Sequence, residues 1–340
     1  MTREPKTPTA PPGAGRVSRP TMRDVAALAG VGIKTVSRVV NGERHVSEET
    51  RQAVERAIAQ LRFRRNAGAA SLRQGQTSTI GLIVEDIGEP IQSNIARGVE
   101  RIAHDAGTLL LTASSSDDEE RERALTLSLI SRRVDGLIIV PSPFDHGFLR
   151  DEADAGLPIV FADRPPVGLA ADVVLADNRG GARTGTQHLI EDGHRRIAFI
   201  GDPEDVYTGA ERLTGYRDAL ANAGLPYDPG LVFLGAPDIA RCDAAVTKAL
   251  AGTWPATALF TGNSLNTLAT LRAPSFQRSD LAHVAFDDFE LADLLRRPLT
   301  VVAQDPAAMG ESAAQLVFDR LGGLEGPART VVLPTTLIAR

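Results

Sequence analysis

The sequence predicts an N-terminal three-helix helix-turn-helix head followed by an α/β core of two doubly wound parallel-sheet lobes. Three observations carry this prediction: an uneven distribution of charge, three short helical patterns in residues 20–65, and a strand–helix alternation through the rest of the sequence. At 340 residues the chain is also longer than one small domain, so two or three units are expected.

Basic residues concentrate at the start of the chain. Residues 1–75 hold 14 Lys and Arg against 6 Asp and Glu, a net charge of +8, whereas the whole chain has a net charge of −6. The remainder therefore carries a net charge of −14. A basic head on an acidic body predicts nucleic-acid binding by the head, with chance clustering as the alternative.

The first helix is expected to begin near Thr21, where Asp24 completes a capping-box-like pattern. Apolar side chains then recur at helical spacing at Val25, Leu28 and Ala29. The tripeptide GVG ends this helix, because two glycines interrupt the pattern. A second helix is expected from about Ile33 to Asn41.

The second helix has two distinct faces. Its apolar stripe consists of Val36, Val39 and Val40. Its other face holds Ile33, Lys34, Ser37, Arg38 and Asn41. Two short helices joined by a tight Gly-containing turn form a helix-turn-helix, braced here by a third helix from Ser47. Its second helix enters the major groove, where Arg38 can pair with guanine and Ile33 can contact a thymine methyl. A solvated face on a protein-interaction module is the alternative.

The head resembles that of the lactose/galactose repressor family of bacterial transcription regulators, through the pattern DVAALAGV..KTVSRVVNGE..VSEETR..V..AI..L.F. It departs from the family at Gly32, which stands in place of the usual Ser, and at Arg62 and Arg65, which stand in place of Gly and Pro. Both arginines add charge for binding phosphates. The helix face and the resemblance together predict the DNA-binding residues Thr21, Ile33, Lys34, Thr35, Ser37, Arg38, Asn41, Arg65, Asn66, Ala69 and Leu72.

Residues 66–78 form a joint rich in small residues. A helix here would be marginal alone, because Gly68 costs roughly 1 kcal/mol relative to Ala and short isolated helices are unstable in water. The resemblance implies a hinge helix that folds when two protomers meet on DNA, with Leu72 as a wedge in the minor groove and Ala69 matching the family's usual Ala. A flexible linker is the alternative, and Gly68 together with Ala70 predicts a looser hinge.

From Thr79 onward, apolar strands such as TIGLIVED and DGLIIVPS alternate with amphipathic helices. This alternation predicts parallel sheets with helices on both faces. No GxGxxG or Walker A motif follows a strand, so a nucleotide site is not expected. Motifs in the same order, from IGLIVED to AFDD and PLTVV.Q, resemble the periplasmic-binding-protein-like core of the same family.

The expected organisation is a disordered tail at 1–19, a helix-turn-helix domain at 20–65, a hinge at 66–78 and an effector-binding and dimerisation core at 79–340. Lobe 1 is expected at about 79–176 plus 305–325, and lobe 2 at about 177–304 plus 330–340. The chain is expected to cross between the lobes near Ala176–Asn178, near Gln304 and near Thr330.

Ligands of such two-lobed cores bind between the lobes, at the carboxyl ends of the strands. By resemblance, the pocket residues are Asp163, Arg212, Asn263, Asp287 and Gln304. Many family members carry a Pro-Phe-Phe-like stretch whose aromatic ring stacks on a sugar. This chain has Ile91 and Gln92 there, with Tyr207 as the nearest aromatic replacement. Turn or cap roles for Asp163 and Asp287, and an ion pair or cap for Arg212, remain alternatives.

These features predict a ligand-responsive, sequence-specific DNA-binding transcription regulator, as a rule a repressor. We expect a homodimer on a pseudo-palindromic operator, with a small polar effector such as a sugar in the interlobe cleft. A solute-binding receptor with the same core is the alternative, disfavoured by the head and by the lack of a secretory signal.

No enzyme activity, cofactor or metal is expected. Cys242 has no His or Asn context that would mark a nucleophile, and His188 and His194 do not share a helix face. No apolar run approaches the length of a membrane helix, so membrane binding is not expected and a cytoplasmic location is.

Overall fold

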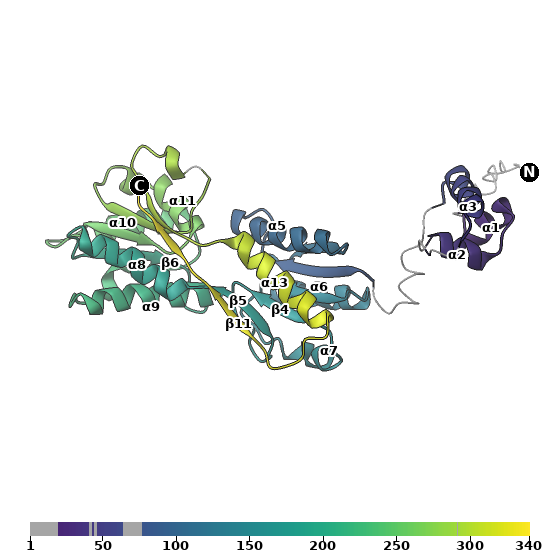
Figure 1. Cartoon of the computed structure of the whole chain (residues 1–340). Coiled ribbons are helices and arrows are strands. Elements are labelled where there is room, and N and C mark those ends of the chain that lie inside the picture. Colours follow the sequence, from purple (N-terminus) through teal and green to yellow (C-terminus); the bar gives the residue numbers. More distant parts are fainter. Residues whose placement is uncertain (1–19, 41–42, 44–45, 64–76, 291) are drawn as a thin grey trace, which may run out of the picture. The chain divides into compact units, whose positions relative to one another are not determined.

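The computed structural model describes residues 20–340 apart from 41, 42, 44, 45, 64–76 and 291 (Figure 1). The chain divides into two compact units, Met1–Gly75 and Gln76–Arg340. The first unit is the head, and the second is called the body below.

The described residues of the head form the helices α1 (Met22–Ala29), α2 (Ile33–Val40) and α3 (Glu48–Leu61). The Asp24 carboxylate accepts a hydrogen bond from the Thr21 backbone N–H at 2.7 Å, which fixes the start of α1. Gly30 has φ 69°, a left-handed conformation that costs Gly little and ends the helix. The predicted helix-turn-helix is therefore present, with the predicted start of each helix.

The core of the head is built from small apolar side chains of all three helices. Its buried members are Val25, Ala26, Val36, Val39, Val54 and Ala57. Leu28, which the apolar spacing placed with Val25, is 45% exposed, and Ala26 is buried instead. The apolar stripe of this short helix thus lies nearer its N-terminal turn than the spacing predicts.

The body contains two six-stranded sheets with corresponding strand orders. The first sheet has the order β11-β5-β4-β3-β1-β2 and is parallel throughout. Its strands are β1 (Thr79–Val84), β2 (Leu109–Ser114), β3 (Gly136–Ile139), β4 (Ile159–Ala162), β5 (Asp172–Ala176) and β11 (Thr330–Leu333). The helices of this lobe are α5 (Pro90–Asp105), α6 (Glu119–Ser131), α7 (Arg150–Asp154) and α13 (Pro306–Leu321).

The second sheet has the order β12-β10-β9-β8-β6-β7, and only β12 runs antiparallel to its neighbour. Its strands are β6 (Ile197–Gly201), β7 (Val232–Leu234), β8 (Ala258–Thr261), β9 (Ala282–Phe286), β10 (Thr300–Ala303) and β12 (Thr336–Ile338). Its helices are α8 (Asn178–Glu191), α9 (Tyr207–Asn222), α10 (Ile239–Ala249), α11 (Ser264–Arg272) and α12 (Pro274–Gln277).

The chain crosses between the lobes three times. The crossings lie between β5 and α8, between β10 and α13, and between β11 and β12. The first two fall where the sequence predicts them. The third differs, because β11 pairs with β5 of the first lobe up to Leu333. The crossing therefore uses Pro334 and Thr335 rather than the neighbourhood of Thr330.

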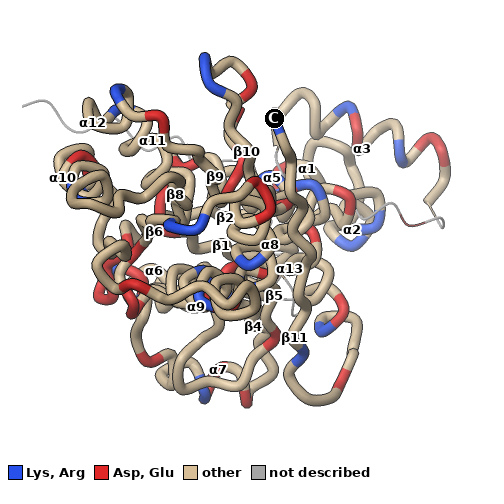
Figure 2. Tube along the Cα trace, turned by 90° about the vertical axis from the view of Figure 1, so that its left-hand side faces the viewer, with Lys and Arg blue, Asp and Glu red and all other residues tan. Residues whose placement is uncertain are grey.

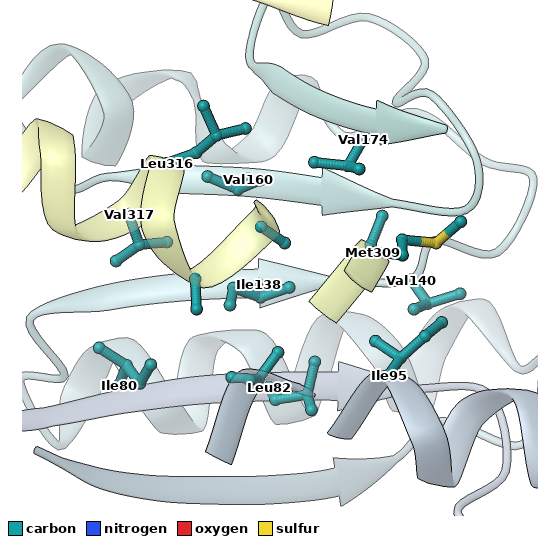
Figure 3. Close-up of a cluster of buried hydrophobic side chains, with 14 of the residues drawn as sticks. Ile80, Leu82, Ile95, Ile138, Val140, Val160, Val174, Met309, Leu316 and Val317 are labelled. Atoms are coloured by element: carbon teal, nitrogen blue, oxygen red, sulfur yellow. The ribbon is translucent and has the colours of Figure 1, made fainter. Parts of the chain in front are cut away.

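A layer of aliphatic side chains joins the first sheet to α5 and α13. Figure 3 shows Ile80, Leu82, Ile138 and Val160 on the strands facing Met309 and Val317 on α13. The two helices touch at glycines: a Cβ atom on Gly98 would lie 2.1 Å from the Ala307 carbonyl oxygen. The second lobe repeats this design where α8 meets α9, since a Cβ atom on Gly215 would lie 2.2 Å from the Arg179 carbonyl oxygen.

Candidate functional site

The outer face of α2 carries the residues predicted to read DNA. Ile33 is 46% exposed, Lys34 and Arg38 are exposed, and Ser37 is half-buried beside them. These four side chains line a shallow hollow together with Met22 and Glu43. Thr21 is exposed at the start of α1, and Thr35 is half-buried on α2. An exposed isoleucine among cations matches a surface that meets both base edges and phosphates.

The sequence did not single out Glu43. Its carboxylate lies 3.7 Å from the Arg38 Nε atom, and its backbone carbonyl accepts a hydrogen bond from Arg51 at 3.2 Å. Glu43 thus lies beside the guanidinium that is predicted to pair with guanine. The other predicted DNA-binding residues lie outside the described part of the chain; they are Asn41, Arg65, Asn66, Ala69 and Leu72.

A cavity of about 230 Å³ lies between the two lobes of the body, where the carboxyl ends of both sheets converge. Seven of the eight residues predicted for the effector site line it, namely Ile91, Gln92, Asp163, Arg212, Asn263, Asp287 and Gln304. Tyr207 is the exception, because its ring packs against the apolar cluster of the first lobe. Among the described residues, no aromatic side chain lines the cavity, so the stacking role predicted for Tyr207 has no support in this geometry.

The second lobe holds one of its cleft-facing acids with amide side chains. The Asp202 carboxylate, directly after β6, accepts hydrogen bonds from Asn263 at 2.7 and 2.8 Å and from Asn266 at 3.0 Å. Arg241 donates in turn to the Asn266 side-chain oxygen. Asn263 also begins α11, because its side chain accepts from the Asn266 backbone N–H at 2.7 Å. This network fixes the side chains on that wall before any ligand arrives.

Arg212 is buried at the floor of the cavity. Its Nε atom donates to Asn178 at 2.8 Å and its Nη1 atom to the Gly262 carbonyl at 2.7 Å. Nη1 also lies 3.6 Å from the Asp287 carboxylate, and the guanidinium stacks on Phe286 at 3.9 Å. Arg212 therefore lines the pocket as predicted from the resemblance, and its ion-pair partner is Asp287 rather than the neighbourhood of Glu211.

The two strand-end aspartates occupy corresponding turns. Asp163 follows β4 with φ 66°, and Asp287 follows β9 with φ 71°. Asp tolerates this left-handed region better than most residues, so the turn role considered for both is real. Asp287 is also held by its side chain, which accepts from Gln304 Nε2 at 2.7 Å and from the Ser264 N–H at 3.3 Å.

The first lobe compensates its cleft-facing acids less completely. Arg164 donates to Glu85 at 2.7 Å and lies 3.6 Å from Asp117 and 3.7 Å from Asp163. Burial raises the pKa of the carboxyls of Glu85 and Asp163. The positive charge of Arg164 lowers both pKa values, and neighbouring carboxylates offset part of that effect. Burial, with the charges of Glu85 and Asp86, also raises the pKa of Glu89 to about 7.

The sequence prediction missed five charged residues of this cavity: Glu85, Glu89, Asp117, Arg164 and Asp202. In Figure 2, acidic segments lie near β6 and at the start of α6. A usable signal was present, since strands β1, β4 and β6 are each followed within two residues by an acid. Parallel strands bring those ends to one edge of a sheet.

Other chemistry-bearing residues of the body have structural partners. Cys242 is fully buried in an apolar cluster. The His194 ring bonds to Thr257 at 2.9 Å, and His188 lies 3.6 Å from Asp192. In the described residues, no group of three or more His, Cys, Asp or Glu side chains could hold a metal ion. None of the described helices combines the length and hydropathy that a membrane span requires.

Two known sequence patterns match the chain. That of the lacI family of bacterial regulatory proteins matches residues 21–66, and that of the periplasmic binding protein-like domain matches residues 186–340. The HTH-type transcriptional regulator CelR of Thermobifida fusca is 38% identical over 337 residues, covering 96% of this chain and 98% of that protein. This chain belongs to the lacI family.

Other members share the whole architecture of this lacI-family chain. The ribose operon repressor of Escherichia coli K12 is 34% identical, covering 88% of this chain and 93% of that protein. The crystal structure of the lac repressor dimer bound to operator and the anti-inducer ONPF has a TM-score of 0.83 at 27% identity, covering 95% of this chain and 98% of that one. The structure of a CelR–cellobiose complex has a TM-score of 0.69 at 36% identity, covering 95% and 99%. The chain is accordingly a ligand-responsive DNA-binding transcription regulator.

Proposed function

We propose that this lacI-family regulator is a repressor that binds a pseudo-palindromic operator as a homodimer. A small hydroxylated effector changes its affinity for that operator, either downward or upward. The observation that carries the proposal is the combination, in one chain, of an exposed cationic α2 face and a polar cavity at the strand ends of two sheets. The head distinguishes this function from that of a solute receptor with the same core.

The effector class follows from the lining of the cavity. Carboxylates and amide oxygens accept hydrogen bonds from hydroxyl groups, and guanidinium groups donate to ring or hydroxyl oxygens. A sugar presents both kinds of partner. The relatives support this choice, since one is named for ribose and a structure of another contains cellobiose. Asp163, Asn263 and Gln304 are proposed as direct contacts, whereas Arg212 and Asp287 also hold the fold of the site.

The proposed homodimer matches the two-fold symmetry of the proposed pseudo-palindromic operator. A two-fold protein places two α2 helices about one helical turn of DNA apart, so each half-site is read by one head. The lac repressor structure named above is a dimer on its operator, which supports the same arrangement here. The proposal includes no catalytic step, and Cys242, the only cysteine of the chain, is buried.

The test begins with duplexes selected from a random library by the full chain. Arg38→Ala should weaken binding to the selected duplex by roughly 1–3 kcal/mol and relax the preference at one base pair in each half-site. Lys34→Ala should weaken binding more uniformly and lower the salt slope by about one. Arg132→Ala, which removes a cation from an exposed site on the body, is the matched control and should change neither. Equal losses in all three variants would contradict the assignment of α2 as the reading helix.

A further inference from the structure

The interlobe cavity has an excess of negative charge. Six carboxylates line it, and they belong to Glu85, Glu89, Asp117, Asp163, Asp202 and Asp287. Among the described residues, only two cationic side chains face them, and both are already engaged: Arg164 with Glu85, and Arg212 with Asp287 at 3.6 Å. A ligand that brought further negative charge would be repelled, so sugar phosphates and sugar acids fit this cavity poorly.

Glu89 is the least compensated of these acids. It stands at the N-cap of α5, but its side chain caps no backbone N–H. No side chain of the described residues donates a hydrogen bond to it. The charged groups around it are Glu85 and Asp86 after β1, Asp202 after β6, and Arg164 after β4, so three of its four charged neighbours repel it. Burial and these neighbours raise its pKa to about 7, which is the response of a carboxylate that lacks a counter-ion.

A second, independent feature is an unpaired hydrogen-bond acceptor in the same part of the cavity. Gln92 lies one turn into α5, is only 3% exposed, and lines the same cavity. Its side-chain oxygen has no hydrogen-bond partner in the part of the chain that the structure describes. Buried amide oxygens are almost always paired, because leaving one unpaired costs about 1–3 kcal/mol. A bound hydroxyl or N–H group would satisfy it.

We propose that the effector carries a protonated amine on a hydroxylated skeleton, with Glu89 receiving the ammonium group and Gln92 and Asp163 receiving neighbouring donors. This rests on the proposed function, in which the cavity is the effector site. An ammonium group supplies three donors and the missing positive charge, which a neutral sugar cannot do. Amino sugars are the ligand class with this chemistry. The aliphatic walls formed by Ile91 and Leu265 replace an aromatic platform.

The test is calorimetric titration of the full chain at about pH 7.5, where an isolated Glu is ionised. The probes are D-glucosamine, D-galactosamine and the glucosamine disaccharide, set against D-glucose, D-galactose, N-acetyl-D-glucosamine and D-glucose 6-phosphate. At least one amine should bind about tenfold or more tightly than its neutral parent, and the phosphate should not bind. Tighter binding of a neutral sugar or of the phosphate overturns the proposal, and so does binding of none of the amines.

The variant Glu89→Gln separates the effect of charge on ligand affinity from the effect of side-chain shape. The variant should lose about tenfold in affinity for the amine and little for a neutral sugar, because Gln keeps the size of Glu89 without its charge. Glu100→Gln, an exposed change on the same helix, is the control and should alter neither affinity. An unchanged preference for the amine in Glu89→Gln would exclude Glu89 as its partner.

The same measurements distinguish the inference from the function on which it rests. If a neutral sugar binds the cavity more tightly than the amines and shifts DNA affinity, the proposed function is supported and the amine-bearing effector is overturned. If the full chain selects no duplex from the random library, the proposed function is overturned, whatever ligand binds between the lobes.

Discussion

The two lobes of the body share one design and differ in how they balance the charges that face the cavity between them. The two sheets have corresponding strand orders. Each lobe pairs two helices through a glycine contact, at Gly98 in the first and Gly215 in the second. Each also ends a strand with an aspartate in the left-handed region, Asp163 after β4 and Asp287 after β9.

The difference lies in the partners of those acids. In the second lobe, Asp202 is held by two amide side chains, and Asp287 by Gln304, the Ser264 N–H and Arg212. In the first lobe, Glu85 and Asp163 share Arg164, and no described side chain donates a hydrogen bond to Glu89. The carboxylates of the second lobe therefore have hydrogen-bond donors before a ligand binds, whereas we propose that Glu89 of the first lobe receives its donor from the ligand.

The largest expected effect tests what the lobes share. Gly98→Ala and Gly215→Ala should each destabilise the body by about 3 kcal/mol, because a methyl group would overlap a backbone carbonyl that a rigid helix cannot move. Urea unfolding followed by circular dichroism measures this. Arg97→Ala on α5 is the control and should stay within about 0.5 kcal/mol of the parent. A large loss in only one of the glycine variants would break the comparison of the lobes.

The next prediction tests the difference between the lobes, at the turns that hold Asp163 and Asp287. Asp287→Asn should cost about 2 kcal/mol, because it weakens the hydrogen bond from Gln304 and leaves the buried Arg212 without its nearest counter-ion. Asp163→Asn should cost nothing or stabilise the body at neutral pH, because burial already raises the pKa of Asp163 and penalises its charge. Asn keeps the left-handed turn in both variants. Equal losses from the two changes would remove the asymmetry.

The smallest effect concerns pH. The pKa of Glu89 is raised in the folded state from an ordinary value of 4.5 to about 7, so the folded chain holds this proton more tightly than the unfolded chain. Its contribution to stability is present below pH 4.5 and is lost as pH rises through 7. After allowance for solvent screening this amounts to about 1 kcal/mol. Thermal unfolding of Glu89→Gln should lack this decline between acid and neutral pH. An identical decline in parent and variant would show that another group titrates.

Much of this architecture could be predicted from the sequence, because its signals are local. The charge split, the Gly turn after α1 and the strand–helix alternation indicate the head and the two lobes without any long-range information. The pocket residues Asp163, Asn263 and Gln304 came from motif resemblance, and their positions at strand ends made the prediction physically reasonable.

The remaining features depend on contacts between distant segments. The acidity of the cavity arises only when Glu85 and Asp202, from different sheets, face one space. Tyr207 lies outside the cavity lining because its ring packs against the apolar cluster of the other lobe, a contact that nothing in the sequence of α9 reveals. The last crossing was placed too early because the short strand β11 reads equally well as an edge of either sheet. Roles on DNA for Asn41, Arg65, Asn66, Ala69 and Leu72 stay predictions.

The central claim, that a ligand in the cavity controls the head, is tested most directly by fluorescence anisotropy of the full chain on its selected duplex. The affinity is measured with and without the probe that binds the body most tightly, at saturation. We expect the ligand to change the DNA dissociation constant by about fivefold or more, the usual range of coupling between two sites. A saturated cavity with an unchanged DNA dissociation constant would contradict the account.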